Sequence, residues 1–517
     1  MKNLVLCFGC LLAATLVSAQ PTIEWQKAFG GSSTDQAYSI QQTVDGGYIV
    51  GGRTNSNNGD IFGNHGGIYF WILKLDGLGS IQWKKILGGS DNETPFAIHQ
   101  TSDGGYVVAG NTLSNDGNVS GNHGDYDAWV VKIDSSGTIL WQKTLGGSGW
   151  EEAWDVQQTT DGGYIVAGRS GSSDGDLTAN YGSLDYWIVK LSIVGEIQWQ
   201  KSLGGSGLDL GYSVEQTTDG GYIVAGESDS QNGHITGNHG GSDYWVVKLN
   251  FEGKIEWEKS LGGGGIDRAN DIHQTRDGGY IAFGQSNSNN GDVTDNHGNN
   301  DFWVIKLGET GDLVWQKALG GANDDFARSI QQTNDDGFIM TGQTQSNNGD
   351  VIGNDGGADL WIVKINETGE IQWQKTLGGT SSETGHSVQQ TNDGGYILAG
   401  QAKSNNGDVS GVHGGDDYWV IKLSPESSPT SNTQSLPLAL YPNPTQESIT
   451  LNIPAQEPSM TIRITDLLGR QLSQQTISND VPGSKVLNLA TLPNGLYLVS
   501  ATTPSGTVYC GKVLKQE

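Results

Sequence analysis

The chain has 517 residues, a formal net charge of −29 and three cysteines. A surface this acidic repels nucleic-acid phosphates and anionic lipid headgroups, so neither is expected as a partner. Cys7 and Cys10 lie in an N-terminal apolar segment, which leaves Cys510 alone in the remainder of the chain and predicts no intrachain disulfide there.

The first residues predict export. Lys2 precedes an apolar run over 4–17, and Ser18 and Ala19 supply small residues before Gln20. This pattern is typical of a secretory signal peptide at 1–19. The run is too short to span a bilayer and no later run approaches about 18 apolar residues, so we expect no membrane insertion.

Two tryptophans recur every 58 residues through most of the chain. The first series is Trp25, Trp83, Trp141, Trp199, Trp257, Trp315 and Trp373, and the second is Trp71, Trp129, Trp187, Trp245, Trp303, Trp361 and Trp419. A glycine-rich unit of this size cannot bury a core alone, so the periodicity predicts a repeat architecture in which neighbours share burial. Seven similar units favour a scaffold over a catalyst, because a catalytic site needs one unlike constellation.

Each unit reads as four strands. In the first repeat we expect strands at 38–43, 48–52, 69–75 and 81–87, with a tight turn at 45–47 and a long polar loop at 55–68. The third strand is apolar on both faces apart from Lys74, which is typical of a strand covered on two sides. The lysines of two repeat positions, the Lys27 series and the Lys74 series, are expected to balance acids of nearby strands or turns.

The phase of the repeat predicts a closed ring. The region begins with a fourth strand at 23–29 and ends with a third strand at 417–423, so joining them gives seven complete units. We therefore expect an all-β fold, a seven-bladed β-propeller at 20–424 whose last blade is closed by the N-terminal strand. An open solenoid would leave two bare strand edges.

Carboxylates gather in the loops of one predicted face. One series occupies the start of the first strand: Asp35, Glu93, Glu151, Asp209, Asp267, Asp325 and Glu383. A second precedes or opens the third strand: Asp127, Asp185, Asp243, Asp301, Asp359 and Asp417, with Tyr69 in the remaining repeat, and Asp60 lies in the long loop. Carboxylates on glycine-rich loops suit Ca²⁺. Turn chemistry is the alternative, because Asp and Asn also cap their own backbone. No other cofactor is expected, and the loop histidines lie too far apart around a ring to share a zinc ion.

The positions that differ between repeats indicate a binding surface. One position at the start of the innermost strand reads Tyr38, Phe96, Trp154, Tyr212, Asn270, Arg328 and His386, and Trp150 lies in the repeat of Trp154. Aromatic faces beside carboxylates suit sugar rings, so a glycan or protein ligand at the channel mouth is one hypothesis. The other is that unequal side chains fill an unequal channel. A polysaccharide-degrading hydrolase or lyase is the alternative function, and it would need two carboxylates near Glu151, Trp154 and Arg328.

The repeat stops before a linker at 425–435 and a β module at 436–517. The module contains YPNP at 441–444, ITDLLGR at 464–470, LPNGLY at 492–497 and GKVLK at 511–515. These motifs resemble the type A C-terminal sorting domain of the type IX secretion system of Bacteroidota, and the repeats look like uncharacterised cargo of such bacteria. The matching residues are Tyr441, Pro442, Asn443, Pro444, Gly469, Pro493, Asn494, Gly495, Tyr497, Gly511, Lys512 and Lys515.

The resemblance implies a small β-sandwich that the outer-membrane translocon recognises and then removes, with the cargo released or attached to the cell surface. The sequence as a whole thus predicts a monomeric, secreted or cell-surface binding or adhesion scaffold.

Overall fold

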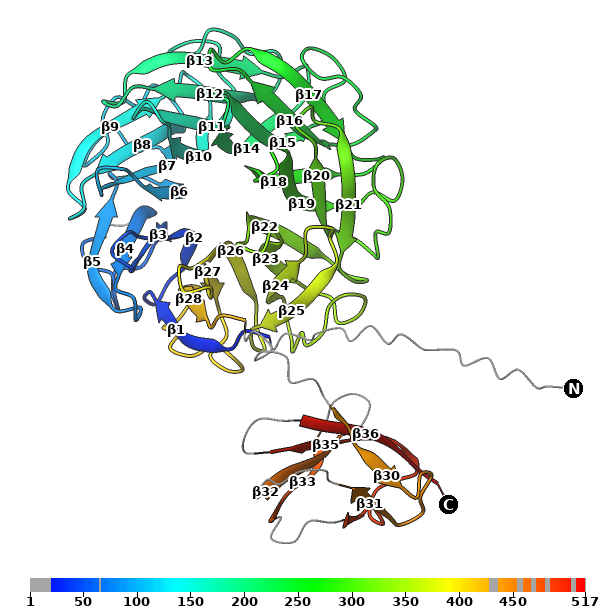
Figure 1. Ribbon diagram of the computed structural model, residues 1–517. Helices are drawn as coiled ribbons and strands as arrows, with labels where there is room; N and C mark the ends of the chain where they lie inside the picture. Colours follow the sequence, from blue (N-terminus) through cyan, green and yellow to red (C-terminus); the bar gives the residue numbers. More distant parts are fainter. Residues whose placement is uncertain are drawn as a thin grey trace, which may run out of the picture. The chain divides into compact units, whose positions relative to one another are not determined.

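The computed structural model describes residues 20–64, 67–426, 436–452, 459–465, 471–478, 484–503 and 508–516. Residues Gln20–Glu426 form one compact unit, and the strands from Leu436 onward belong to another. Every element of the described chain is a β-strand (Figure 1). Within these residues no helix is long and apolar enough to cross a membrane.

The larger unit is a ring of seven four-stranded antiparallel sheets, numbered here as blades 1 to 7 (Figure 1). Blade 1 contains β2 (Asp35–Gln42), β3 (Tyr48–Thr54), β4 (Tyr69–Leu75) and β5 (Ile81–Leu87). Blade 2 contains β6 (Glu93–Gln100), β7 (Tyr106–Thr112), β8 (Asp127–Ile133) and β9 (Ile139–Leu145). Blade 3 contains β10 (Glu151–Gln158), β11 (Tyr164–Ser170), β12 (Asp185–Leu191) and β13 (Ile197–Leu203). Blade 4 contains β14 (Asp209–Gln216), β15 (Tyr222–Ser228), β16 (Asp243–Leu249) and β17 (Ile255–Leu261).

Blade 5 contains β18 (Asp267–Gln274), β19 (Tyr280–Ser286), β20 (Asp301–Leu307) and β21 (Leu313–Leu319). Blade 6 contains β22 (Asp325–Gln332), β23 (Phe338–Thr344), β24 (Asp359–Ile365) and β25 (Ile371–Leu377). Blade 7 contains β26 (Glu383–Gln390), β27 (Tyr396–Ala402), β28 (Asp417–Leu423) and the N-terminal β1 (Ile23–Phe29). The seven-bladed propeller closed by the N-terminal strand is confirmed.

The repeat pattern places its apolar residues between the blades. All seven residues of β4, and of its counterpart in every other blade, are buried. Each apolar cluster joins two neighbouring blades: Ile49 and Phe70 of blade 1, for example, pack with Ile98 and Trp129 of blade 2. No blade therefore has a complete core of its own, which is why the blades need one another.

Polar contacts close the ring at its inner circumference. The glutamine that ends each innermost strand accepts a hydrogen bond from a backbone N–H in the turn of an adjacent blade, as Gln100 Oε1 does from Val44 at 2.9 Å. Asn392 of blade 7 donates to Gln42 of blade 1 at 2.8 Å, which completes the circle. The last blade is completed by β1, where Ala28 pairs with Trp419.

The first strand of each blade is longer than the sequence pattern predicted. In blade 1 it begins at Asp35 rather than Tyr38. Asp35 pairs with Thr54, and a β-bulge between Ala37 and Ser39 shifts the register of the pairs that follow. The second strand likewise runs to Thr54 rather than Gly52. The third and fourth strands have the predicted bounds.

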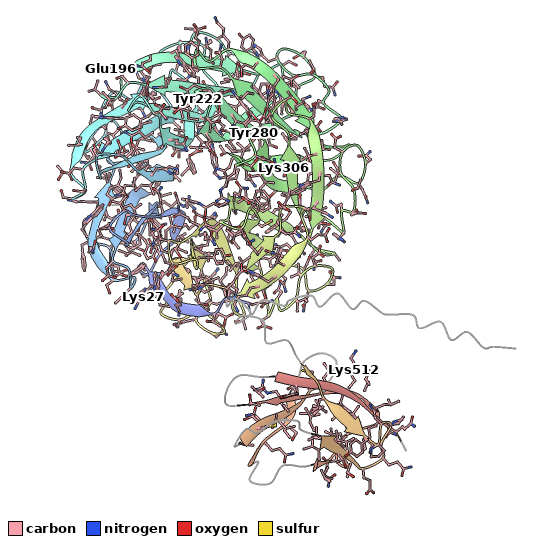
Figure 2. All side chains as sticks on the ribbon, in the orientation of Figure 1. Lys27, Glu196, Tyr222, Tyr280, Lys306 and Lys512 are labelled. Carbon is pink, nitrogen blue, oxygen red and sulfur yellow. The ribbon has the colours of Figure 1, made fainter. Side chains whose placement is uncertain are left out.

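Seven buried lysines are paired with turn carboxylates as predicted. Lys306, labelled in Figure 2, is 7% exposed and lies 3.0 Å from Asp277. The equivalent pairs in the other blades measure 2.9 or 3.0 Å. Each lysine thus neutralises a turn while its aliphatic stem fills the blade.

The C-terminal unit is a small sandwich of two sheets. Its five-stranded sheet contains β29 (Leu436–Pro437), β36 (Val508–Lys515), β35 (Gly495–Thr502), β32 (Ser459–Thr465) and β33 (Gln471–Ser478) in that order. The three-stranded sheet contains β30 (Ala439–Tyr441), β31 (Ser448–Asn452) and β34 (Ser484–Asn488). One apolar cluster includes residues of both sheets, among them Ile449, Leu487, Ile462 and Val499, which confirms the predicted sandwich.

Candidate functional site

The first series of acids organises the loops of each blade. Asp35 is fully buried, and its carboxylate accepts bonds from the Gly31 N–H at 2.8 Å, the Ser56 hydroxyl at 2.8 Å and the Thr54 hydroxyl. Glu151 accepts from the Gly147 N–H at 2.8 Å and the Ser172 N–H at 3.0 Å. Equivalent bonds reach Glu93, Asp209, Asp267, Asp325 and Glu383. These carboxylates hold the long loop of a blade to the loop that connects it with the preceding blade.

The second series lies against the first across the blade boundaries. Asp185 Oδ2 accepts the Tyr181 N–H at 2.5 Å, but Asp185 Oδ1 is buried without a hydrogen-bond partner among the described residues. A Cβ atom added at Gly204 would lie 2.3 Å from Asp185 Oδ1 and 2.6 Å from Asp209 Oδ2. The two carboxylate oxygens therefore lie close to one another, beside Gly204. The other pairs are Asp417 with Asp35, Asp127 with Glu151, Asp243 with Asp267, Asp301 with Asp325, and Asp359 with Glu383. At the remaining boundary Tyr69 faces Glu93.

Burial of these carboxyl groups shifts their titration. Burial raises the pKa of Asp185 from 3.8 to about 6, the bond from Tyr181 opposes the rise, and the charge of Asp209 adds to it. The same combination of burial and a neighbouring carboxylate raises the pKa values of Asp127, Asp301 and Asp359 to about 6. Each pair therefore favours one bound proton at mildly acidic pH.

Calcium binding by these acids stays a prediction. No group of three or more His, Cys, Asp or Glu side chains suited to a metal occurs in the described part of the chain. Asp60 accepts the Gly30 N–H at 3.2 Å, and the equivalent His234 accepts the Gly204 N–H at 3.1 Å, so this position ties loops together with or without a carboxylate. The described loop histidines also bond within their own loops, as His123 does to Asp127 at 2.7 Å; His65 lies outside the described residues.

The structure brings six of the seven expected ligand-binding residues into one cavity. A cavity of about 470 Å³ opens at the central channel, and Tyr38, Phe96, Trp154, Tyr212, Arg328 and His386 line it. Gln36, Arg268, Asn270, Gln343, Thr384 and Gln401 complete the lining. Every blade contributes at least one residue, because equivalent positions of the innermost strands converge on the axis.

Aromatic rings form most of one side of the cavity. Phe96 and Trp154 stack with ring centroids 4.0 Å apart and 14° between planes, and Tyr212 meets Trp154 edge-on at 5.2 Å. Tyr38 contacts Phe96 at 5.9 Å and His386 at 5.1 Å. Blades 7, 1, 2, 3 and 4 thus present a continuous arc of rings.

Cationic and polar groups complete the lining. Arg328 forms no ion pair or hydrogen bond among the described residues, and burial and the nearby Arg268 lower its pKa. Arg268 is neutralised by Glu227 at 2.8 Å, which also accepts the Tyr212 hydroxyl at 2.8 Å. Burial and Arg328 lower the pKa of His386 to about 3, so its imidazole is neutral. Arg328 therefore carries the unbalanced charge of the cavity.

Two residues of the predicted constellation lie elsewhere. Trp150 is not part of the lining; its ring is 41% exposed, stacks under Arg169 at 4.4 Å and tilts against Tyr126. Glu151 is buried in the loop network described above. Glu152 is bound by Arg169 at 2.8 Å and by the indole N–H of Trp154 at 2.9 Å. Glu151 and Glu152 point to opposite faces because neighbouring residues of a strand alternate. Trp150 precedes β10, and its indole N–H donates to Glu152 at 3.2 Å.

The sequence analysis did not identify five of the residues that line the cavity. Arg268, Gln36 and Thr384 occupy one repeat position, and Gln343 and Gln401 another. Both positions vary between repeats as the Tyr38 position does. The same signal of variation was therefore present at these two positions.

The motif residues of the C-terminal unit support its fold. Asn443 accepts the Leu514 N–H at 2.9 Å and donates to the Lys512 carbonyl at 2.7 Å, so the YPNP segment is fixed to β36. Tyr497 donates to the Pro493 carbonyl at 2.6 Å beside Asn494 and Gly495, and Lys515 donates to the Ala490 carbonyl at 3.0 Å. A side chain at Gly511 would meet the Leu438 carbonyl at 2.7 Å. Tyr441 is half exposed, and Gly469 lies outside the described residues.

Comparison with known proteins identifies this unit. Residues 439–516 match the secretion system C-terminal sorting domain, which confirms the type IX sorting domain. The regulatory protein FlaEY of Caulobacter vibrioides is 27% identical over 152 residues, which are 28% of this chain and 15% of that protein's length.

Solved structures of low identity are also similar. The Pan2 WD40 domain of Neurospora crassa is 10% identical, with 65% of this chain and 90% of that chain covered and a TM-score of 0.33. Puromycin hydrolase is 10% identical, with 82% and 59% covered and a TM-score of 0.44. The sorting domain and the ring of seven four-stranded sheets make the chain a β-propeller cargo of the type IX secretion route, which delivers it to the cell surface or beyond.

Proposed function

We propose that the exported propeller is a binding scaffold that holds a glycan at the mouth of its central channel. The observation that carries the proposal is the convergence of the variable repeat positions on one cavity of about 470 Å³. That volume lies within the range of small-ligand sites. Variation at these positions, inside repeats that are otherwise nearly constant, is what a ligand-facing surface requires.

The chemistry of the lining favours a sugar. The arc from His386 to Tyr212 supplies aromatic edges and faces, and Gln343, Gln401 and Asn270 supply amide donors and acceptors. Sugar rings present apolar C–H faces and hydroxyl groups that suit such a mixture. An anchoring side chain of a protein partner is the other ligand class that these groups accept.

Hydrolysis is less well supported than binding. The twelve residues that line the cavity include no Asp or Glu. Glu152 and Glu227, which accept hydrogen bonds from the cavity residues Trp154 and Tyr212, are each paired with an arginine. Glycoside hydrolysis by the usual route needs two carboxyl groups on either side of the scissile bond, and this lining does not provide them.

The test is glycan-array binding by the exported chain, followed by affinity measurement on any hit. Trp154→Ala is expected to weaken binding at least tenfold, because it removes the ring that contacts both Phe96 and Tyr212. Tyr181→Ala is the matched control, since Tyr181 is a half-exposed aromatic residue of the same blade outside the cavity, and it is expected to bind as the unchanged chain does. Equal loss in both variants, or no loss in either, would contradict the proposed site.

A further inference from the structure

A second cavity lies at the boundary of blades 1 and 2, away from the channel. Its volume is about 650 Å³, and Phe62, Tyr69, Trp71, Lys84, Lys85 and Ser90 are among the residues that line it. This is the boundary at which Tyr69 replaces the aspartate found at the other six. Blade 1 therefore departs from the repeat where the cavity occurs.

The buried tryptophan of this blade lacks the partner that its six counterparts have. In the other blades the indole N–H donates to a Gln or Glu of the neighbouring outer strand, at 2.7 to 3.1 Å. The acceptors are Gln142, Gln200, Glu258, Gln316, Gln374 and Gln26. In blade 1 this position is Lys84, which cannot accept, and Trp71 Nε1 is buried with no hydrogen-bond partner among the described residues.

A second substitution opens the space beside it. In the other blades the Gln or Glu also reaches the long loop at a position occupied by Ser120, Thr178, Thr236, Thr294, Ile352 or Ser410. Blade 1 has Phe62 there, which is 72% exposed, with the Lys84 ammonium 5.2 Å from its ring centroid. The Gln or Glu link to this loop position is thus absent from blade 1, where the Lys84 ammonium instead donates to the Asp60 carbonyl of the same loop.

We propose that this cavity binds the carboxylate of a small sugar acid. Glu258 shows that a carboxylate fits the acceptor position, since its Oε2 lies 3.0 Å from Trp245 Nε1. In blade 1 the ligand carboxylate takes that position. It accepts the Trp71 N–H once the exposed Lys84 side chain leaves the Asp60 carbonyl, and it is neutralised by the Lys84 ammonium. The exposed ring of Phe62 provides a face for the sugar.

The acids of the cavity do not oppose this assignment. Asp60 accepts the Gly30 N–H at 3.2 Å, and Asp116 accepts the Ser90 N–H at 2.7 Å. Both carboxylates are held by backbone donors of the loop that leads into their blade. The Lys84 ammonium donates to the Asp60 carbonyl and has no carboxylate within ion-pairing distance among the described residues.

The test uses the full exported chain labelled with 5-fluorotryptophan, and Trp71→Phe assigns the fluorine resonance of Trp71. Glucuronate is expected to shift that resonance in a saturable titration, whereas glucose is not. Lys84→Gln restores the side chain found in the other blades, so it is expected to raise the Tm and to weaken glucuronate binding at least tenfold. Lys143→Gln, in the equivalent strand of blade 2, is the control and should bind normally.

Three results would overturn the inference: no shift with glucuronate at concentrations of tens of millimolar, an equal shift with glucose, or unchanged binding by Lys84→Gln. N-acetylglutamate separates the source of the carboxylate. An equal response to it would support the carboxylate subsite and overturn its assignment to a sugar. None of these outcomes depends on the channel mouth, so the two sites are tested independently.

Discussion

Substituting one carboxyl of a blade-boundary pair should stabilise the propeller at neutral pH. In Asp185→Asn the amide keeps an oxygen for the Tyr181 N–H and places an NH₂ group where the partnerless Asp185 Oδ1 faces Asp209. The variant therefore imitates the protonated aspartate that the buried site prefers. It also removes a charge that burial and Asp209 both disfavour.

The magnitude follows from the pKa of Asp185, which rises from 3.8 to about 6. In that interval the folded state binds more protons than the unfolded state, so stability is full below about pH 4 and declines as the pH rises to about 6. A shift of about two units corresponds to at most about 3 kcal/mol at pH 7. For a cooperative unit of about 400 residues, about 1 kcal/mol changes the Tm by about 1 °C.

Calorimetry at pH 4 and pH 7 measures the effect. Asp185→Asn is expected to raise the Tm by about 1 to 3 °C at pH 7 and to leave it unchanged at pH 4. Asp134→Asn is the control, because Asp134 is exposed in a turn and hydrogen bonds lower its pKa, so it titrates below this interval. If Asp185→Asn lowered the Tm equally at pH 7 and at pH 4, relative to the unchanged chain, the destabilising effect assigned to the carboxyl pair would be refuted.

The remaining predictions concern ring closure, the internal lysines and calcium. Deleting residues 20–30 removes β1 from blade 7. In calorimetry we expect this variant to lose the single cooperative unfolding transition expected of the full chain, because the deletion leaves a bare strand edge. An unchanged melting curve would contradict ring closure by this strand. Lys190→Met should cost about 1 kcal/mol in urea unfolding at pH 7, since Asp161 is half exposed. Lys190 helps to lower the pKa of Asp161 to about 2, against the effect of burial. The stability contributed by this ion pair is therefore lost as the pH falls from about 4 to 2. The difference in unfolding free energy between the variant and the parent should vanish at about pH 2. Chelation of calcium should leave the Tm unchanged if hydrogen bonds alone satisfy the loop acids, whereas a drop that added Ca²⁺ reverses would establish calcium sites.

Most of the residues that line the cavity at the channel mouth could be predicted from the repeats. Tyr38, Phe96, Trp154 and Arg328 differ at one repeat position, and a ring places equivalent positions at one radius and one height. Trp150 does not line the cavity because it precedes β10, and its closeness in sequence to Trp154 does not place it on the innermost strand. The lining glutamines were missed because variation between amides and charges is also common on solvent-exposed strands.

Sequence by itself determined the all-β class, the number of blades, the strand that closes the ring and the sorting domain. These follow from a constant period, its phase at both ends and local motifs, none of which requires knowledge of distant contacts. Only the tertiary structure decided that Asp185 faces Asp209 and that Trp71 lacks an acceptor beside Lys84. Those relations join residues of adjacent blades or strands, and they depend on sheet register and on the packing of one blade against the next, which a one-dimensional period does not contain.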